Sequence, residues 1–172
     1  MKSLKHNIYL YVVLLICQNG YAQIEYFNRV YNYNVSNVIK GVVVKDTFYY
    51  TAGTIRDSIN VNNVRVYLNK HSQNGGIIWN KSWCEINTEY ALGWTSPLIT
   101  TFDNGFAICG GMRDSTIYWY SFLMKLNSYG DTLWKKEFYD TISSINYDYL
   151  AFYNIKETYD KGFIIVGEVM GS

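Results

Sequence analysis

Three aspartates recur at a constant spacing and are the first candidates for a chemical site. Asp46, Asp103 and Asp160 are equally spaced, because the interval between the first two is the same as the interval between the last two. A carboxylate repeated in this way could bind calcium or the hydroxyls of a sugar, but calcium prefers about 6–8 oxygen ligands. None of the residues that follow the aspartates adds a second carboxylate: they are Thr47, Asn104 and Lys161. We therefore expect each aspartate to begin a turn, in which its side chain accepts a hydrogen bond from a backbone N–H.

Catalytic and metal chemistry have few residues to draw on. From Gln23 onward the chain has one histidine, His71, which we expect in an exposed turn. A Ser-His-Asp or Cys-His arrangement needs a positioned histidine, and zinc needs a cluster of His and Cys. A glycosidase needs only two carboxylates, and nothing in the spacing of the acids selects a pair. The sequence therefore predicts no catalytic, cofactor-binding or metal-binding residue.

Aromatic side chains are the other candidates, because the chain has 18 tyrosines, five tryptophans and eight phenylalanines. Rows of them at Tyr118–Tyr120 and Tyr147–Tyr153 could stack on sugar rings. A strand exposes at most every second side chain, so we favour packing between sheets for most of them. Trp79 and Trp134 occupy the same position after a turn in two copies of a repeat, which indicates a structural lock.

The elements that would position these residues are copies of one repeat. VKDTFYYTAGTI, FDNGFAICGGM and YDKGFIIVGEV align with one another, and Gly53, Gly110 and Gly167 form a second column with the same interval as the aspartates. A fixed period of this kind indicates that one supersecondary unit is stacked several times. We place the copies at about 35–85, 92–140 and 150–172.

The central copy shows how each unit folds. Phe106–Met112 is apolar at both even and odd positions, which predicts a strand that is buried on both faces. Asp103–Gly105 is a tight-turn signal that joins it to the β-prone run Leu98–Thr101. Two further strands are expected at Tyr118–Leu126 and Thr132–Tyr139, with a turn between them. Each unit therefore supplies four antiparallel strands in about 40 residues.

The first copy follows the same order. We match its alternating residues Val64, Val66 and Leu68 with Phe122, Met124 and Leu126; this leaves a turn, Asn69–Gly76, that is three residues longer than its counterpart. The third copy reaches only its second strand. The segment Ser143–Lys156 could form a short helix instead of a strand.

Residues 1–22 have the pattern of a secretory signal peptide. Two lysines precede the apolar run Ile8–Cys17, and a small residue, Ala22, follows it. The run is shorter than the roughly 20 residues of a membrane-spanning helix, so no stable membrane insertion is expected. Lipidation of Cys17 is disfavoured because Ile16 precedes it. We expect cleavage after Ala22 and a secreted or cell-surface protein, 23–172.

The remaining chain has 13 basic residues, after Lys2 and Lys5 are removed, against 14 acidic ones, so its formal net charge is −1. With no basic run, nucleic acid and anionic membranes are poor candidates as partners. Export permits a disulfide between Cys84 and Cys109. Because Cys109 shares a column with Ala52 and Val166, we favour two packed thiols over a bridge.

Four-stranded antiparallel units with a tryptophan near the start of the last strand are typical of β-propeller blades. On the residues TFDNGFAICGG, FLMKLN and SYGDTLW, the chain resembles the repeats of secreted bacterial β-propeller proteins that are exported by type IX secretion. The hairpin that ends in Trp134 is also similar to the tryptophan-docking turn of quinoprotein propellers, where the tryptophan locks adjacent blades. The resemblance covers about residues 28–169.

The resemblance implies an all-β protein of antiparallel four-stranded blades, with about two and a half repeats. A ring needs roughly four blades, so this ring would be incomplete, and the chain would be a truncated or N-terminal piece of a longer protein. We expect a non-enzymatic surface or extracellular interaction module without a cofactor. Its partner would be an unidentified protein or a glycan, and its open blade edges would permit self-association. The alternative is a propeller-type carbohydrate-active enzyme or glycan-binding protein.

Overall fold

The computed structural model describes residues 36–56, 63–114, 119–139 and 147–171, and all secondary structure in these residues is β-strand. The prediction of an all-β fold is confirmed. Most of the segment that could have formed a short helix belongs to a strand, Tyr147–Glu157. No helix long and apolar enough to cross a membrane occurs in the part of the chain that is described. The proposed signal peptide and the start of the mature chain lie outside the described residues.

The first four strands form one antiparallel meander. They are β1 (Asn37–Lys45), β2 (Phe48–Arg56), β3 (Val64–His71) and β4 (Ile77–Trp83). Each pairs with the next in sequence. These residues favour strands because they are rich in β-branched and aromatic side chains. We call this meander the first unit.

The second unit has the same order, but its first strand is split. Its continuous strands are β7 (Phe106–Arg113), β8 (Tyr120–Leu126) and β9 (Thr132–Phe138). The first strand consists of β5 (Glu89–Leu92) and β6 (Leu98–Thr100), which pair with different halves of β7. Residue 92, near which the sequence analysis places the start of the second copy, is the last residue of β5. A parallel bridge between Val64 and Glu89 joins the two units into one mixed nine-stranded sheet.

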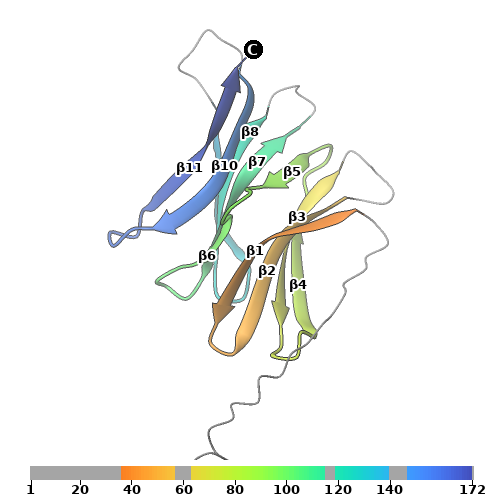
Figure 1. Ribbon diagram of the computed structural model, residues 1–172, viewed down its shortest axis with the longest axis vertical. Coiled ribbons are helices and arrows are strands. Elements are labelled where there is room, and N and C mark those ends of the chain that lie inside the picture. The colour runs from red at the N-terminus through yellow and green to blue at the C-terminus, as the bar shows by residue number, and fades with distance from the viewer. Residues whose placement is uncertain (1–35, 57–62, 115–118, 140–146, 172) are drawn as a thin grey trace, which may run out of the picture.

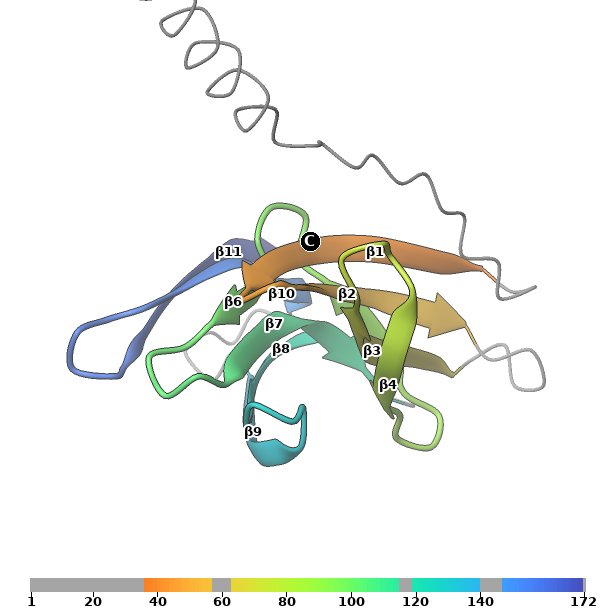
Figure 2. The ribbon, with the colours of Figure 1, turned by 90° about the horizontal axis from the view of Figure 1, so that it is seen from below.

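The third unit is the hairpin of β10 (Tyr147–Glu157) and β11 (Phe163–Gly171), which forms a separate two-stranded sheet. Figures 1 and 2 show β7 and β8 between this hairpin and the sheet of β1 to β4. The second unit therefore lies in the middle, with the other two on either side.

Two apolar clusters fill the spaces between the units. Phe106 and Ile108 of β7 belong to the cluster against the first unit, whereas Ala107 and Cys109 belong to the cluster against the hairpin. All four residues are fully buried, which confirms the predicted burial of this strand on both faces. The predicted common face of β8 is also confirmed, because Phe122, Met124 and Leu126 all lie in the first cluster.

The structure corrects the match between the first two units. The β3–β4 turn, Ser72–Gly76, has five residues, as does the β8–β9 turn, Asn127–Asp131. In both turns the first residue's N–H donates to the carbonyl of the last, at 2.8 and 2.9 Å, and Gly75 and Gly130 share a positive φ of 78° and 80°. The first copy therefore has no insertion in this turn, and His71 corresponds to Leu126.

The expected exposure of His71 is accordingly wrong. His71 ends β3, is 3% exposed, and its Nε2 lies 2.8 Å from Thr51 Oγ1 on β2. Burial lowers the pKa of His71, because the charged imidazolium is poorly solvated there. The prediction placed the turn at Asn69, a favourable turn residue, but Asn69 is buried in the strand and accepts a hydrogen bond from the Asn80 side chain.

Candidate functional site

Asp103 and Asp160 lie in turns of identical design. Asp103 Oδ1 accepts hydrogen bonds from Thr101 Oγ1 at 2.6 Å and from the Gly105 N–H at 3.1 Å. Asp160 Oδ1 accepts from the Thr158 hydroxyl and, at 3.2 Å, from the Gly162 N–H. Each side chain thus satisfies backbone and hydroxyl donors of its own turn, as the sequence interpretation supposed.

Asp46 behaves differently, because the β1–β2 turn has only two residues and Asp46 itself adopts a φ of 55°. A carboxyl side chain tolerates this left-handed conformation better than most. The three aspartates therefore sit at separate hairpin tips. No cluster of three or more His, Cys, Asp or Glu that could hold a metal ion occurs among the residues that the structure describes.

Asp103 has one additional partner, the buried ammonium of Lys125. Lys125 Nζ donates to both carboxylate oxygens at 2.8 Å and to the Leu126 carbonyl at 3.2 Å. The hydrogen bond from Lys125, with that from Thr101, lowers the pKa of Asp103 to about 2. Lys70 occupies the corresponding position of β3 and instead lies 3.7 Å above the Phe48 ring. The pair stabilises a turn.

The glycine column marks the closest approach between strands. A Cβ on Gly53, Gly110 or Gly167 would lie 2.1, 2.2 or 2.2 Å from a carbonyl oxygen of the unit's first strand. These oxygens belong to Val38, Ala91 and Ala151, respectively. Real carbon–oxygen contacts of this kind are about 3.3 Å or longer, so only glycine fits at these positions.

Each glycine faces a point where the first strand carries extra residues. In β1, Ile39 pairs with Gly53 and Gly41 with Ala52, which leaves Lys40 as the bulged residue. In β10, the corresponding bulged residue is Tyr153, which lies between Phe152, opposite Gly167, and Asn154. Bulges re-aim a side chain and bend the strand that carries them.

In the second unit the bulge is expanded into a short loop. Leu92 pairs with Gly110, and regular pairing resumes at Leu98. The Cys109 N–H donates to the Pro97 carbonyl at 2.9 Å, so residues 93–96 are the extra segment. This loop carries Trp94, which is 70% exposed. The first strands of all three units are therefore interrupted next to the residue that pairs with the glycine.

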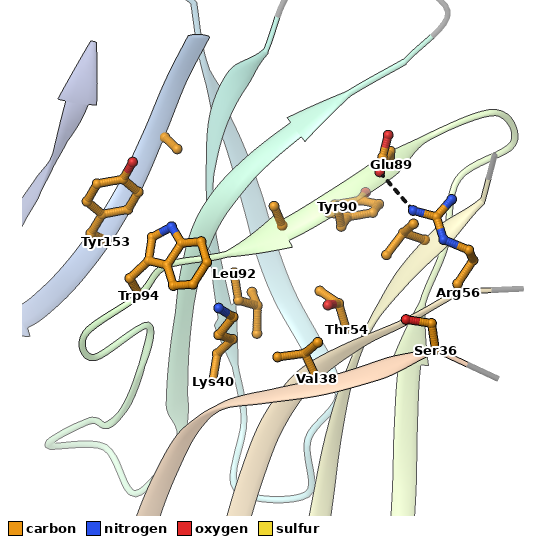
Figure 3. A pocket seen from close by; sticks show the side chains of 13 residues that line it. Ser36, Val38, Lys40, Thr54, Arg56, Glu89, Tyr90, Leu92, Trp94 and Tyr153 are labelled. Carbon is orange, nitrogen blue, oxygen red and sulfur yellow. Dashed lines mark hydrogen bonds and ion pairs between the residues drawn. The ribbon is translucent and has the colours of Figure 1, made fainter. Parts of the chain in front are cut away.

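The interruptions converge on one cleft with a volume of about 230 Å³. Lys40, Trp94 and Tyr153 line it, one from each unit, and Figure 3 shows them on one side of the cleft. The remaining wall comes from Ser36, which precedes β1, and from residues of β1, β2, β3, β5 and β10: Val38, Thr54, Arg56, Val64, Glu89, Tyr90, Ala91, Leu92 and Ala151. Glu89 and Arg56 lie at the opposite end from Tyr153.

The charges of the cleft do not balance. Among the described residues that line it, Glu89 is the one acid, and it is bound by Arg56 at 3.2 Å and by Arg113 at 2.6 Å. Lys40 Nζ lies 3.3 Å from the centre of the Trp94 ring, a cation–π contact. These lining side chains thus carry one more positive than negative charge, next to an exposed indole.

Trp79 and Trp134 lie between neighbouring units. The ring of Trp79 on β4 is 3.0 Å from where a Cβ on Gly130, in the β8–β9 turn, would stand. Trp134 on β9 makes an edge-to-face contact with Phe163 of β11, with ring centres 6.0 Å apart. Both are partly buried against an apolar cluster. Each tryptophan therefore packs its unit against the next one.

Two members of the aromatic rows, Tyr120 and Phe152, also pack. Tyr120 is buried, and Phe152 contacts Phe138 edge to face at 5.2 Å. Tyr153 is the member that reaches the cleft, where its hydroxyl donates to Glu168 Oε2 at 2.5 Å. Tyr118 and the side chains of Tyr147 and Tyr149 lie outside what the structure describes.

The two cysteines of the described chain are free thiols. Cys109 is buried, and burial raises its pKa to about 12, so it is an inert apolar side chain. Cys84 is exposed rather than packed, which corrects half of the expectation of two packed thiols.

The sequence interpretation missed Lys40, Trp94 and Glu89. A signal was present, because Lys40-Gly41 and Gly93-Trp94 interrupt the β-prone runs that precede the aspartate turns. Aligning the first strands, rather than the more regular second strands, would have placed these residues with Tyr153. A scan against protein-family models finds no match for this chain, and no curated protein matches it in sequence.

Proposed function

We propose that this chain is part of a secreted, non-enzymatic β-propeller-type repeat protein that acts as an extracellular interaction module and holds its ligand in the cleft of the first strands. The observation that carries the proposal is the convergence of Lys40, Trp94 and Tyr153 on one cleft. In a propeller, the first strands of successive blades surround a common axis, and side chains that leave those strands meet there.

Three further observations support blades. Two units share the order of four antiparallel strands, and the second strand of each unit carries a glycine that closely approaches the first strand. The tryptophans of the fourth strands, Trp79 and Trp134, each pack on the next unit. Among the described residues, nothing covers the third unit as the hairpin covers the second: Ile164 and Val166 are 61% and 58% exposed, whereas Ala107 and Cys109 in the same columns are fully buried. This contrast favours an incomplete ring, with a face of β11 that a further blade or a second molecule would cover.

An interaction role fits the cleft better than catalysis. Hydrolysis of glycosides by the common mechanism uses two carboxylates across the scissile bond. Glu89 is the one carboxylate among the described lining residues, and two arginines neutralise it. Secretion rests on the sequence pattern of residues 1–22.

The test is a binding screen on the exported protein, purified as residues 23–172 after its cleavage site is checked by intact mass. Immobilised glycans and extracellular proteins are screened with the wild type and with Trp94→Ala, which removes the exposed ring of the cleft. The proposal expects at least one ligand whose binding needs Trp94. Binding that Trp94→Ala leaves unchanged for every ligand would overturn the cleft as the site, and turnover of a glycan would support the enzymatic alternative.

A further inference from the structure

We propose that the cleft recognises a single acidic sugar residue, with Trp94 as the stacking surface and Lys40 as the partner of the sugar carboxylate. This rests on the proposed function, in which the cleft is a binding site, and it adds the chemical class of the ligand.

The Trp94 loop is held in place although it exposes its indole. Ser96 N–H and Thr95 Oγ1 both donate to the Tyr153 carbonyl, at 3.2 and 3.0 Å, and the Ile155 N–H donates to the Ser96 carbonyl at 3.3 Å. Gly93 lies so close to β10 that a Cβ there would be 2.5 Å from Tyr153 Cα. An exposed tryptophan on an anchored loop loses little entropy when a ligand binds, which is the usual benefit of a preorganised site.

The indole suits a sugar ring. The apolar C–H face of a pyranose packs on the flat face of an aromatic ring, and tryptophan offers the largest such face. Lys40 covers part of the ring, but a residue that is 70% exposed keeps most of its surface open to a ligand. The cleft volume of about 230 Å³ is below the ~300–1,000 Å³ of ordinary ligand pockets. It therefore fits one sugar residue of a glycan rather than a long segment.

The charge of the cleft selects an acid. Arg56 and Arg113 use both oxygens of Glu89, so the acidic group of the wall is already neutralised. Lys40 has no carboxylate partner among the described contacts, and it lies against an aromatic face, where water is partly excluded. A carboxylate that enters beside Trp94 would meet this ammonium at the solvent-exposed mouth of the cleft, where their attraction weakens as the salt concentration rises.

The remaining walls suit hydroxyl groups. Ser36 and Thr54 supply hydroxyls on the β1 and β2 side, and the hydrogen-bonded pair Tyr153–Glu168 stands at the other end. Single-stranded nucleic acid would need a longer basic groove than one lysine and one arginine provide. An acidic peptide would satisfy Lys40 but would leave the indole without a flat partner. The observations therefore favour a sugar that combines a carboxylate, hydroxyls and an apolar face.

The experiment compares oligosaccharides of galacturonic acid with galactose oligosaccharides of the same length and linkage, as ligands of the 23–172 protein. Binding is measured by calorimetry and by tryptophan fluorescence at low and high salt. We expect the acidic sugar to bind at least tenfold more tightly than the neutral one, with an advantage that shrinks as salt rises. Lys40→Gln should remove this tenfold advantage without weakening the neutral sugar, and Trp94→Ala should abolish binding of both.

Matched controls separate the cleft from general effects. Lys156→Gln removes an exposed lysine of β10 outside the cleft, and Tyr159→Ala removes a ring that is 99% exposed at the β10–β11 tip. Both should leave the affinities unchanged, and all variants should have the same melting temperature as the wild type.

Equal binding of acidic and neutral sugars, an acidic preference that survives Lys40→Gln, or equally tight binding of a glutamate-rich peptide would overturn the inference. If no acidic sugar binds while another ligand needs Trp94, the inference fails and the proposed function stands. If no ligand of any class needs Trp94, both fail.

Discussion

Replacing Gly110 by alanine tests the packing that creates the cleft. The new Cβ would stand 2.2 Å from the Ala91 carbonyl oxygen, 3.0 Å from Phe122 Cε1 and 3.1 Å from Leu92 Cα. The closest atom belongs to the backbone of β5, so no rotamer change relieves the contact. A normal carbon–oxygen separation of about 3.3 Å requires β5 to move outward by about 1 Å.

This displacement has a predictable cost. It disturbs the pairing of Leu92 with Gly110 and lifts β5 from the buried ring of Phe122. Overpacking of a filled core typically costs about 1–3 kcal/mol, and we expect Gly110→Ala to lie at the upper end because backbone must move. At about 2–4 °C per kcal/mol for a chain of this size, the melting temperature should fall by roughly 6–12 °C.

The assay is urea and thermal unfolding of the 23–172 protein, with Gly76→Ala as the control. Gly76 has only side-chain atoms nearby, Ser72 Oγ at 3.2 Å and Asn74 Oδ1 at 3.4 Å, so this change should shift stability by no more than about 0.5 kcal/mol. Gly167→Ala should cost less than Gly110→Ala, because β11 pairs only with β10 in the described residues and can shift. If Gly110→Ala has the same free energy of unfolding and melting temperature as the wild type, the close approach of β5 and β7 is refuted, and with it the geometry of the cleft.

Three further outcomes follow from the structure. Trp134→Ala should lower the free energy of unfolding by about 3 kcal/mol, the lower end for loss of a large aromatic, since the ring is only partly buried against Phe163; chemical denaturation measures this. Because the pKa of Asp103 is lowered to about 2, its pair with Lys125 contributes stability above about pH 4 that is lost as the pH falls toward 2. Asp103→Asn should therefore reduce the loss of unfolding free energy between about pH 4 and pH 2, by at most about 1 kcal/mol after allowance for solvent screening. A loss of the same size in Asp103→Asn and in the wild type would contradict this. Sedimentation should show self-association of the wild type through the exposed face of β11 that Val166→Lys abolishes, and a wild type that stays monomeric at high concentration would count against an open face.

Features that depend on local periodicity could be predicted from the sequence. The burial of β7 on both faces follows from apolar residues at odd and even positions between Phe106 and Met112. The turns at Asp103 and Asp160 follow from the short reach of an aspartate side chain to its own backbone. In both cases the physical cause lies within one short stretch of the chain.

The register of β3 could not be predicted in this way. The sequence match paired Val66 with Met124, whereas the equal turns pair Val66 with Ser121, three positions away. An odd shift inverts the faces of a strand. Val66 and Met124 nevertheless lie in the same cluster, because that cluster is the contact between the front of one unit and the back of the next. Apolar alternation therefore looks correct in either register, and only the turn geometry distinguishes them.

The cleft also escaped prediction, because bulges leave no periodic signal of their own. Each unit combines a constant residue, the glycine whose missing Cβ admits the first strand, with a variable residue that the bulge turns outward. The constant residue carries the packing of the unit, and the variable ones, Lys40, Trp94 and Tyr153, belong to neither of the two apolar clusters. Substitutions at the bulges can therefore change what the cleft binds without disturbing the fold, whereas substitutions at the glycines must disturb both. This separation gives the scaffold a site whose chemistry can differ while its architecture stays the same, and it explains why the residues that most resemble one another between the units are not the ones that we assign to binding.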